Sequence, residues 1–384
     1  MKQTPFELKI MAGMRTLIRM TGFRVGCWEV RLASSSHPRE ALLELTMECN
    51  MDCLYCFRRG CPELFGRMDE RTFRRVLWEL RRAGVRRIVF TGWGEPLTHP
   101  KALEFLEEAK EGGFNVVLNT NGTLLESCAE EVVKAGVDEV VVSLDSADEG
   151  VYSELHPGNS VSEILRGLRS LREALVNLGR RVVVGFHTTL TTLNCRQAPA
   201  ILRTAFRFGA AYVRFSNVVP LNREMEGLAC YMDEDCRKAM ESFFKSLGML
   251  LETPVRVYMP NLTLKAQRTC PFTRRDGLFV GWDGGVSPCL HYGHSYTTHL
   301  YGVGRRIDRV TFGNLTEESL TELWRSRPYQ AFRFRAEVGC LPSCLDCDMA
   351  EYCTFTEDNT MDCWGNTPTC SHCPFIYGLT ACPL

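Results

Sequence analysis

The feature that most constrains the fold is an alternation of short apolar runs with helical patterns between residues 41 and 220. Apolar, β-branched strands joined by helices are typical of a parallel sheet that is buried on both faces. Six such units are too few for a closed eight-stranded barrel, so we expect an α/β fold, a partial (β/α)6 barrel of the TIM type. The expected strands are 41–45, 87–91, 115–119, 139–144, 181–189 and 212–217, and the expected helices are 70–83, 102–111, 126–135, 161–178 and 196–208.

The rest of the chain divides into three segments. Residues 1–40 form an N-terminal extension, in which we expect an amphipathic helix and a short strand near Trp28. Residues 221–268 connect the barrel to the C-terminal part through a helix at 233–251 and a short strand. Residues 269–384 are rich in Gly, Pro, Cys and aromatic residues with little periodicity. We therefore expect metal centres, rather than a side-chain core, to hold this last segment together.

Three cysteines, Cys49, Cys53 and Cys56, follow the first expected strand in the pattern C-x3-C-x2-C. Three thiolates on one tight loop can hold three irons of a cubane cluster and leave the fourth iron open to a substrate. A closed zinc site would need one more ligand, for which Cys61 is the only nearby candidate, and such sites favour paired cysteines. The spacing therefore predicts an iron–sulfur cluster with an open iron, and structural zinc or free thiols remain the alternative.

Polar residues and tight turns follow the other expected strands. Functional residues of parallel α/β folds gather at the carboxyl ends of the strands, so we expect these groups to form one pocket with the cysteine loop. The last two strands end in His187 and in Ser216-Asn217, which could line a substrate cavity or be satisfied groups of the core. The candidates after the second, third and fourth strands are Gly92, Gly94, Glu95, Asn119, Asn121, Ser143 and Asp145.

Charge and hydropathy exclude several classes of partner. The formal net charge is −1, so bulk electrostatics predicts neither a nucleic-acid nor a membrane partner. The apolar runs are broken well before the length of a bilayer span. The first twenty residues lack the apolar core and the cleavage site of a signal peptide. We therefore expect a cytoplasmic protein.

The 19 cysteines are too many for an ordinary intracellular domain. Disulfides would imply export, and in a reducing compartment clustered cysteines are more often ligands of metals or clusters. Ten of them lie between Cys270 and Cys382, in addition to the three of the loop. The scattered ones, which we expect to be small buried apolar residues, are Cys27, Cys61, Cys128, Cys195, Cys230 and Cys236.

The C-x3-C-x2-C loop, with Tyr55 before its last cysteine and with the turn Gly94-Glu95-Pro96 downstream, resembles the radical S-adenosylmethionine (SAM) superfamily. The resemblance implies that Cys49, Cys53 and Cys56 hold a catalytic [4Fe-4S] cluster whose open iron binds SAM. One-electron reduction of SAM would then release a 5′-deoxyadenosyl radical that abstracts hydrogen from the substrate.

The same resemblance implies roles for residues around the cofactor. The turn with Gly92, Gly94 and Glu95 would receive the methionine amino group of SAM, although Trp93 stands where the family has a second adjacent glycine. We expect Trp93 to pack against the site or to form a wall for the adenosine. The residues implied beside the adenine, the ribose and the carboxylate are Tyr55, Asn119, Asn121, Ser143 and Asp145.

The C-terminal cysteines resemble the SPASM extension, which binds two auxiliary [4Fe-4S] clusters. Two patterns carry this resemblance, C-x13-G-x4-C from Cys270 to Cys289 and C-x2-C-x5-C from Cys344 to Cys353. The next cysteine, Cys363, lies ten residues on rather than four, so the ligand partition beyond Cys353 stays open, and zinc knuckles are the alternative. We expect the first cluster to use Cys270, Cys289, Cys363 and, as a candidate fourth ligand, Cys340; the second would use Cys344, Cys347, Cys353 and Cys373, with Cys370 and Cys382 as alternatives.

Several short stretches near the C-terminus resemble a subfamily, the maturases of tungsten-cofactor oxidoreductases. They are 312–315, 323–324, 329–333 and the tail 362–373 with Cys382-Pro383. This resemblance implies a tungsten-pterin cofactor, or the aldehyde:ferredoxin oxidoreductase that carries it, as substrate or partner. A low-potential electron donor of the ferredoxin or flavodoxin type would supply the electron.

Two other functions remain open. The chain could modify a peptide or protein side chain, by a sulfatase-maturase-like oxidation or by thioether formation, with the auxiliary clusters accepting the electron left after hydrogen abstraction. It could also be a non-catalytic iron–sulfur electron carrier or scaffold, which fully cysteine-ligated sites throughout would favour.

A basic segment follows Cys289 and offers many hydrogen-bond donors. It could receive phosphates or the edge of a pterin, or it could be a solvated loop. A histidine metal site is a third reading, which the irregular spacing disfavours. The residues are His291, His294, His299, Arg305 and Arg306.

Overall fold

A computed structural model describes residues 22–25, 27–31, 37–249, 254–265 and 268–381. The chain forms two units, Met1–Ser36 and His37–Leu384. In the first unit, an antiparallel hairpin pairs β1 (Gly22–Val25) with β2 (Trp28–Arg31), so the strand expected near Trp28 is present. The helix expected nearer the N-terminus lies outside the described residues.

The second unit is built on a ten-stranded sheet with the order β14-β11-β10-β3-β4-β5-β6-β7-β8-β9. From β10 to β9 in this order each strand is parallel to the next, whereas β11 pairs antiparallel with both β10 and β14. The six expected strands form its centre in chain order, which confirms the partial α/β barrel. They are β3 (Glu40–Leu43), β4 (Arg87–Phe90), β5 (Asn115–Thr120), β6 (Glu139–Ser143), β7 (Val183–Leu190) and β8 (Tyr212–Asn217).

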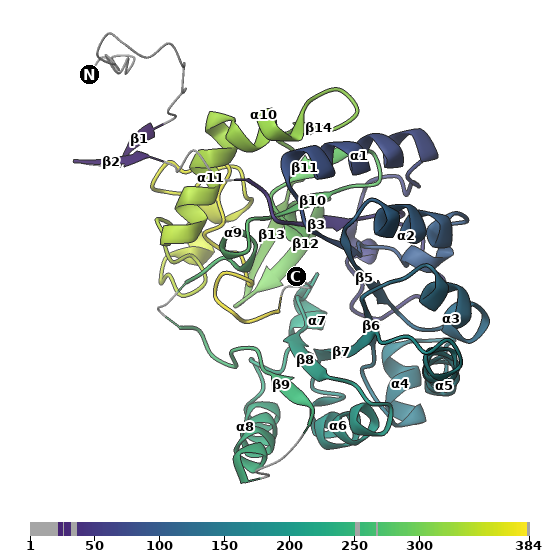
Figure 1. The fold of residues 1–384 in the computed structure, drawn as a ribbon. Helices are drawn as coiled ribbons and strands as arrows, with labels where there is room; N and C mark the ends of the chain where they lie inside the picture. The colour runs from purple at the N-terminus through teal and green to yellow at the C-terminus, as the bar shows by residue number, and fades with distance from the viewer. Residues whose placement is uncertain (1–21, 26, 32–36, 250–253, 266–267, 382–384) are drawn as a thin grey trace. The chain divides into compact units, whose positions relative to one another are not determined.

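Helices cover the outer face of these strands (Figure 1). Local sequence sets their ends: the carboxylate of Asp69 accepts the backbone N–H of Thr72 at the start of α1, and Gly84 ends α1 with φ of 88°. The expected helices are present within two residues at each end. Their bounds are α1 (Glu70–Ala83), α2 (Ala102–Glu111), α3 (Leu125–Lys134), α5 (Val161–Asn177) and α6 (Ala198–Arg207), with a further short helix, α4 (Glu149–Leu155).

Both faces of the central strands are buried. Successive side chains of a strand point to opposite faces, and Leu43 and Phe90 pack with the outer helices, whereas Leu42 and Val89 pack with aromatic residues of the C-terminal segment. Because the C-terminal segment covers the inner face, the carboxyl ends of the strands open into an enclosed space rather than onto the surface.

The connecting segment continues the barrel. It contains α7 (Arg223–Glu226), α8 (Glu234–Met249) and β9 (Arg256–Tyr258), which pairs with β8. None of the helices in the described part of the chain is long and apolar enough to cross a bilayer.

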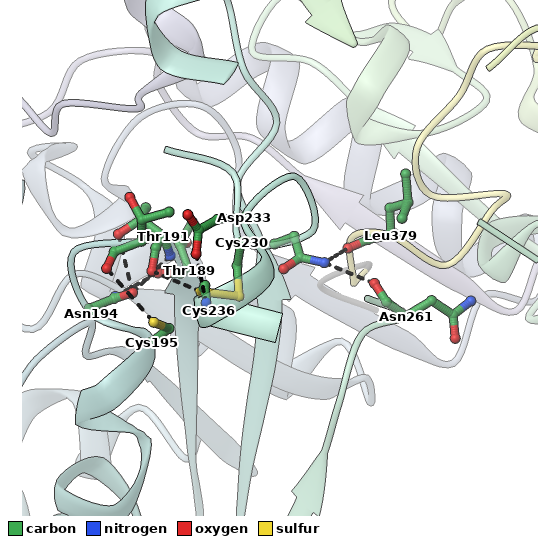
Figure 2. Close-up of a disulfide and its surroundings, with 11 residues drawn as sticks. Thr189, Thr191, Asn194, Cys195, Cys230, Asp233, Cys236, Asn261 and Leu379 are labelled. Carbon is green, nitrogen blue, oxygen red and sulfur yellow. Dashed lines mark hydrogen bonds between the residues drawn. A yellow bond between two sulfur atoms is a disulfide. The ribbon is translucent and has the colours of Figure 1, made fainter. Parts of the chain in front are cut away.

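A disulfide bond joins Cys230 and Cys236 in this segment, which was not expected. Both residues are buried, and Figure 2 shows the bond beside Thr191 and Asn194. The prediction that these cysteines are buried is therefore confirmed, and the expectation that they are free thiols is wrong. The clustering of the other cysteines pointed to reduced thiols, and it carries no information about a pair only six residues apart.

The C-terminal segment has regular structure and shares its apolar core with the barrel, contrary to the expectation. Its strands extend the sheet, since β10 pairs with β3 in parallel. Large aromatic side chains, among them Tyr292, Trp324 and Tyr329, are fully buried. The elements are α9 (Pro271–Arg274), β10 (Gly277–Val280), β11 (Gly285–Ser287), β12 (Tyr296–Leu300), β13 (Val303–Ile307), β14 (Gly313–Asn314), α10 (Leu320–Arg325) and α11 (Arg327–Val338).

Short 3-10 helices lie in the connections. Two of them are close to the expected site, because η1 (Phe57–Gly60) follows the cysteine loop and η2 (Pro96–Thr98) follows the turn after β4. The others are η3 (Cys195–Gln197), η4 (Leu290–Tyr292), η5 (Ala350–Tyr352) and η6 (Thr354–Thr356).

Candidate active site

A cavity of about 270 Å³ lies at the carboxyl ends of the strands, where the sequence predicts the pocket. Cys53 and Cys56 form part of its wall together with Trp93 and Tyr152. The strand ends contribute most of the remaining lining, and eight of these residues are among the sequence candidates. They are Gly92, Asn119, Asn121, Ser143, Asp145, His187 and Ser216-Asn217.

The three cysteines of the loop converge beside this cavity. Burial is the main reason that the pKa of Cys49 and that of Cys53 are raised, and neighbouring loop thiolates raise both pKa values further. Arg58 donates to the carbonyl oxygen of Met51 at 2.5 Å, and its guanidinium lies beside Cys56. Three converging thiols at the edge of a cavity fit a cluster whose remaining iron is open to a ligand.

The described residues contain no group of three or more His, Cys, Asp or Glu side chains arranged around one metal ion. In a cubane each thiolate binds a different iron, so its ligands stand farther apart than those of a zinc ion.

The turn after β4 packs directly on the cysteine loop. A Cβ atom on Gly94 would lie 2.3 Å from the carbonyl oxygen of Thr46, so only glycine fits there. The backbone N–H of Glu95 donates to the carbonyl oxygen of Glu48 at 2.9 Å. The turn and the loop are thus held at a fixed separation.

The carboxylate of Glu95 is directed at the end of β5 and is not part of the cavity wall. It accepts the backbone N–H of Asn121 at 2.6 Å and the hydroxyl of Thr120 at 2.8 Å. Burial raises its pKa to about 7, against the hydrogen bonds that lower it. Its side chain therefore positions the neighbouring strand end, while its backbone belongs to the turn.

Asp145 links the cysteine loop to two other parts of the cavity wall. Its carboxylate accepts a hydrogen bond from the hydroxyl of Tyr55 and from the backbone N–H of Thr189, the latter at 2.6 Å. Nε2 of His156 lies 2.9 Å from the same carboxylate. Burial is the main cause of the raised pKa of Tyr55. His156 and Tyr152 were not predicted, because one histidine and one tyrosine in a helical stretch give no distinctive sequence pattern.

The end of β5 is bound to the cysteine loop. The side-chain amide of Asn121 donates to Oδ1 of Asn50 at 2.9 Å and lies 3.7 Å from Sγ of Cys49. Asn50 in turn donates to the hydroxyl of Thr123. Asn121 therefore positions the loop as well as lining the cavity.

The C-terminal tail closes one side of the cavity, which the sequence did not indicate. The hydroxyl groups of Ser216 and Thr380 lie 2.6 Å apart, and the side-chain amide of Asn217 donates to the carbonyl oxygens of Leu379 and Asn261, which are labelled in Figure 2. Thr380 and Ala381 line the cavity. Such contacts span more than 160 residues, so no local pattern could reveal them.

His187 lies on the remaining wall. Its burial and the nearby charge of Arg214 lower its pKa to about 4, so the imidazole is neutral near pH 7. His187 therefore adds no positive charge to the wall of the cavity near β7.

Four C-terminal cysteines form one group, and its membership differs from the expected partition. Cys370 and Cys373 lie near Cys270 and Cys289, since these thiolates raise the pKa of Cys370, for which burial is the largest cause. The expected partition placed Cys373 with Cys344 and had Cys370 only as an alternative. The tail bonds to the segments of the first cysteines, since the backbone N–H of Thr269 donates to the carbonyl oxygen of Ile376 and the hydroxyl of Tyr292 donates to that of Thr369.

The ring of His372 supports a cluster at this group. It is fully buried between Cys370 and Cys373, and neither ring nitrogen has a partner among the described residues. Burial lowers its pKa to about 3. The sulfur atoms of an anionic iron–sulfur cluster would accept a hydrogen bond from the N–H of such an unpartnered imidazole.

The remaining cysteines divide differently from the prediction as well. Cys363 lies close enough to Cys344 to raise the pKa of that thiol, which is raised mainly by burial. This neighbour differs from the one expected for Cys363, which was Cys270. Cys347 and Cys353 flank η5 in the same segment, the backbone carbonyl of Cys340 accepts the side chain of Asn366, and Cys382 lies outside the described residues.

The basic segment after Cys289 is neither a solvated loop nor an anion site. His294 lies between the carboxylates of Glu44 and Glu63, and His299 lies 2.8 Å from Glu226. His291 is buried against Tyr296, and Arg305 is buried with its guanidinium donating to backbone carbonyls. Arg306 pairs with two aspartates. The cations are therefore already matched by partners within the protein.

Comparison with known proteins gives the family. Residues 43–205 match the radical SAM superfamily, and residues 270–348 match SPASM, an iron–sulfur cluster-binding domain. A tungsten-containing aldehyde ferredoxin oxidoreductase cofactor-modifying protein of Pyrococcus furiosus is 30% identical over 347 residues, which cover 89% of this chain and 96% of that protein. A probable GTP 3′,8-cyclase of Methanopyrus kandleri is 36% identical over 168 residues, 43% of this chain and 54% of that protein.

Solved structures share the fold at low identity. SuiB of Streptococcus suis bound to S-adenosylmethionine aligns with a TM-score of 0.59 and 16% identity, over 83% of this chain and 73% of that one. The protein anSMEcpe with bound AdoMet aligns with a TM-score of 0.60 and 18% identity, over 83% and 85% of the two chains. Together with the converging cysteines and the strand-end cavity, these matches show that the chain belongs to the radical SAM superfamily of enzymes, carries a SPASM iron–sulfur domain, and is a relative of the P. furiosus cofactor-modifying protein.

Proposed function

We propose that this protein is a maturase that uses radical SAM chemistry to modify the tungsten-pterin cofactor of an aldehyde:ferredoxin-oxidoreductase-type enzyme. The observation that carries the proposal is the extent of one similarity. The P. furiosus cofactor-modifying protein is matched over 89% of this chain and 96% of its own length, through barrel and C-terminal segment alike, whereas the probable GTP 3′,8-cyclases of Methanopyrus kandleri and Methanococcus maripaludis are matched over 43% and 66% of this chain. The tungsten enzyme that carries the cofactor is the proposed partner.

Cys49, Cys53 and Cys56 would hold the [4Fe-4S] cluster, and SAM would bind at its open iron. When bound and reduced, this cluster supplies the electron that cleaves SAM to a 5′-deoxyadenosyl radical. The protein has to orient SAM and to keep water from the radical, because radical intermediates react unselectively.

The residues around the cavity suit both tasks. Asp145, fixed by Tyr55 and His156, stands at the end of β6, where it can accept hydrogen bonds from ribose hydroxyls. Trp93 is nearly buried and stacks on Phe57 at 5.4 Å, which closes the cavity beside the cysteine loop. Asn121 holds the loop in place.

The substrate would be contacted by the ends of β7 and β8. His187 is neutral there, and Ser216 and Asn217 are held by the tail. Thr380 and Ala381 limit the depth of the cavity on this side. We infer that the tail contributes to substrate selection.

Two auxiliary [4Fe-4S] clusters are proposed for the C-terminal segment. The first would use Cys270, Cys289, Cys370 and Cys373, which lie together around His372. The second would use Cys344 and Cys363 with Cys347 and Cys353. These clusters would pass electrons between the cavity and a low-potential partner of the ferredoxin or flavodoxin type.

The test uses anaerobically reconstituted full-length protein, SAM, dithionite and a purified tungsten aldehyde:ferredoxin oxidoreductase. We expect the mass of the extracted tungsten-pterin cofactor to change, and the Cys53→Ala variant to leave it unchanged. A wild-type reaction that leaves the cofactor mass unchanged while altering a peptide or protein side chain would contradict the proposal and support the peptide-modifying alternative.

A further inference from the structure

A buried histidine lies between two carboxylates beneath the turn after β4. Nε2 of His294 is 2.7 Å from Oε2 of Glu44, and its Nδ1 is 2.8 Å from Oε2 of Glu63. The side chains of His294 and Glu44 are 1% and 0% exposed. The chemistry proposed above uses none of the three.

The three residues come from separate segments of the chain. Glu44 directly follows β3, and Glu63 lies beyond η1, downstream of the cysteine loop. His294 follows η4 in the SPASM segment, and the backbone N–H of Ser295 donates to Oε1 of Glu63 at 2.8 Å. The cluster therefore links the C-terminal segment to both parts of the barrel that form the SAM site.

His294 acts as the counter-ion of Glu44. An imidazole with an acceptor at each nitrogen must carry both protons to donate to both. Burial alone would lower the pKa of His294, but the hydrogen bonds and charges of Glu44 and Glu63 raise it above its ordinary value. The neighbouring cation, Arg309, is bound to Asp283 by two contacts of 2.7 and 2.8 Å. The Glu44 carboxylate thus has a dedicated partner in the interior.

Glu44 uses its other oxygen to hold the turn. Oε1 accepts the backbone N–H of Trp93 at 2.8 Å. A Cβ atom on Gly92 would lie 2.4 Å from Cγ of Glu44, so glycine at this position makes room for the carboxylate. In a trans peptide the N–H and the preceding carbonyl point in opposite directions. With the N–H of Trp93 directed at Glu44, the carbonyl of Gly92 faces the cavity that Gly92 lines.

We propose that His294 is a positioning residue for SAM: by holding Glu44, it fixes the Gly92–Trp93 peptide with its carbonyl toward the cavity, where that carbonyl accepts a hydrogen bond from the methionyl ammonium group. This role rests on the SAM site proposed for the turn. The reversed peptide would present an N–H to the ammonium group and repel it. The placement of the SPASM segment therefore sets the affinity of the barrel for SAM.

A second contact from the same segment supports this role. The indole N–H of Trp93 donates to the carbonyl oxygen of Leu290 at 3.3 Å, and the ring of His294 meets the indole at 5.0 Å with an interplanar angle of 66°. Trp93, which replaces the family's second glycine, is thus held through both its backbone and its side chain. This geometry gives a reason for a tryptophan at a position that the family pattern fills with glycine.

The test compares four variants in the full-length reconstituted protein. His294→Leu leaves Glu44 buried without its counter-ion, so the turn should lose its orientation. The double variant Glu44→Gln/His294→Leu removes the buried charge, and its glutamine oxygen can still accept the N–H of Trp93. His294→Gln is the conservative change. His299→Leu is the matched control, because it breaks another histidine–glutamate pair of the same segment that does not touch the turn.

SAM affinity is measured by anaerobic equilibrium dialysis, and the reduced cluster with SAM is followed by electron paramagnetic resonance. We expect His294→Leu to raise the Kd for SAM at least tenfold, as for the loss of a hydrogen bond to a charged group. His294→Gln should raise the Kd less. The double variant should restore the Kd to within about threefold of wild type, which corresponds to a small part of the free energy of such a bond. His299→Leu should lower the melting temperature and leave the Kd unchanged. If His294→Leu fails to fold, the double variant and His294→Gln carry the comparison.

Two results would overturn different claims. A wild-type protein that does not bind SAM would contradict the SAM site itself. If wild type binds SAM and neither His294→Leu nor His294→Gln changes the Kd, the role of His294 is contradicted. The same holds if His299→Leu raises the Kd as much as His294→Leu does. Either result would leave the SAM site standing.

Discussion

The hydroxyl group of Tyr55 donates a hydrogen bond to the carboxylate of Asp145, 90 residues later in the chain. Tyr55 lies between two cysteines of the loop, and Asp145 follows β6. The bond therefore fixes the loop against the strand end at which the ribose of SAM is expected. Other contacts of the candidate site likewise join a strand end to a different segment, such as the one between Asn121 and Asn50.

Replacing Tyr55 by Phe tests this contact. The change keeps the ring and removes one donor to Asp145, which retains His156 and the N–H of Thr189. We expect the Kd for SAM to rise about threefold to tenfold, the range for a typical net hydrogen-bond contribution, because Asp145 keeps two other donors, while iron content stays unchanged. Equilibrium dialysis under anaerobic conditions measures the affinity. A Phe variant that binds SAM as tightly as wild type would show that the bond does not position Asp145.

The grouping of the C-terminal cysteines can be tested by counting iron. Removing two ligands of one cluster should cost about four irons, the same as removing either one, whereas removing ligands of two clusters should cost about eight. We therefore expect Cys270→Ala/Cys373→Ala to lose about four irons and Cys270→Ala/Cys363→Ala to lose about eight. The opposite pattern would support the partition that sequence spacing alone suggests.

The disulfide should stabilise the protein modestly. Cross-linking cysteines only six residues apart removes little chain entropy, so Cys230→Ser should lower the free energy of unfolding by about 2 kcal/mol. Denaturant unfolding of wild type and variant measures the difference, with Cys195→Ser, a buried free cysteine nearby, as the control. Alkylation of both Cys230 and Cys236 in the unreduced, unfolded wild-type protein would contradict the bond.

His187 should make the protein sensitive to mild acid. Its pKa is about 4 in the folded protein, below its ordinary value of 6.5, because burial disfavours the charged ring. The unfolded state therefore binds more protons below pH 6.5, and stability is lost as the pH falls from there toward 4. Between pH 7.5 and 5.5 this histidine should account for about 1 kcal/mol of lost stability. His187→Gln should remove that share, and an unchanged pH dependence in urea unfolding would contradict the assignment.

Much of the barrel could be predicted from sequence because its signals are local. The strand at 212–217 and the helices at 70–83 and 102–111 have the expected bounds. Apolar runs, caps and breaks in periodicity all act within a few residues. The strand-end cavity followed from the same reasoning, since parallel strands place their carboxyl ends at one edge.

What could not be predicted depends on contacts between distant segments. The spacing of Cys49, Cys53 and Cys56 correctly indicated that these thiols converge. The grouping of Cys373 with Cys270, in contrast, depends on how the tail folds back. Glu44 looks like an ordinary polar residue at a strand end, and only its contacts with Trp93 and His294 give it a role. The basic segment was misread for the same reason, because its counter-ions lie elsewhere in the chain.

The most direct test of the central claim is the release of 5′-deoxyadenosine. Anaerobically reconstituted protein, reduced with dithionite and mixed with SAM, should contain about twelve irons and release the nucleoside. The Cys53→Ala variant should keep about eight irons, those of the auxiliary clusters, and release none. Undiminished release by this variant, or a wild-type protein that binds zinc in place of iron, would contradict the account.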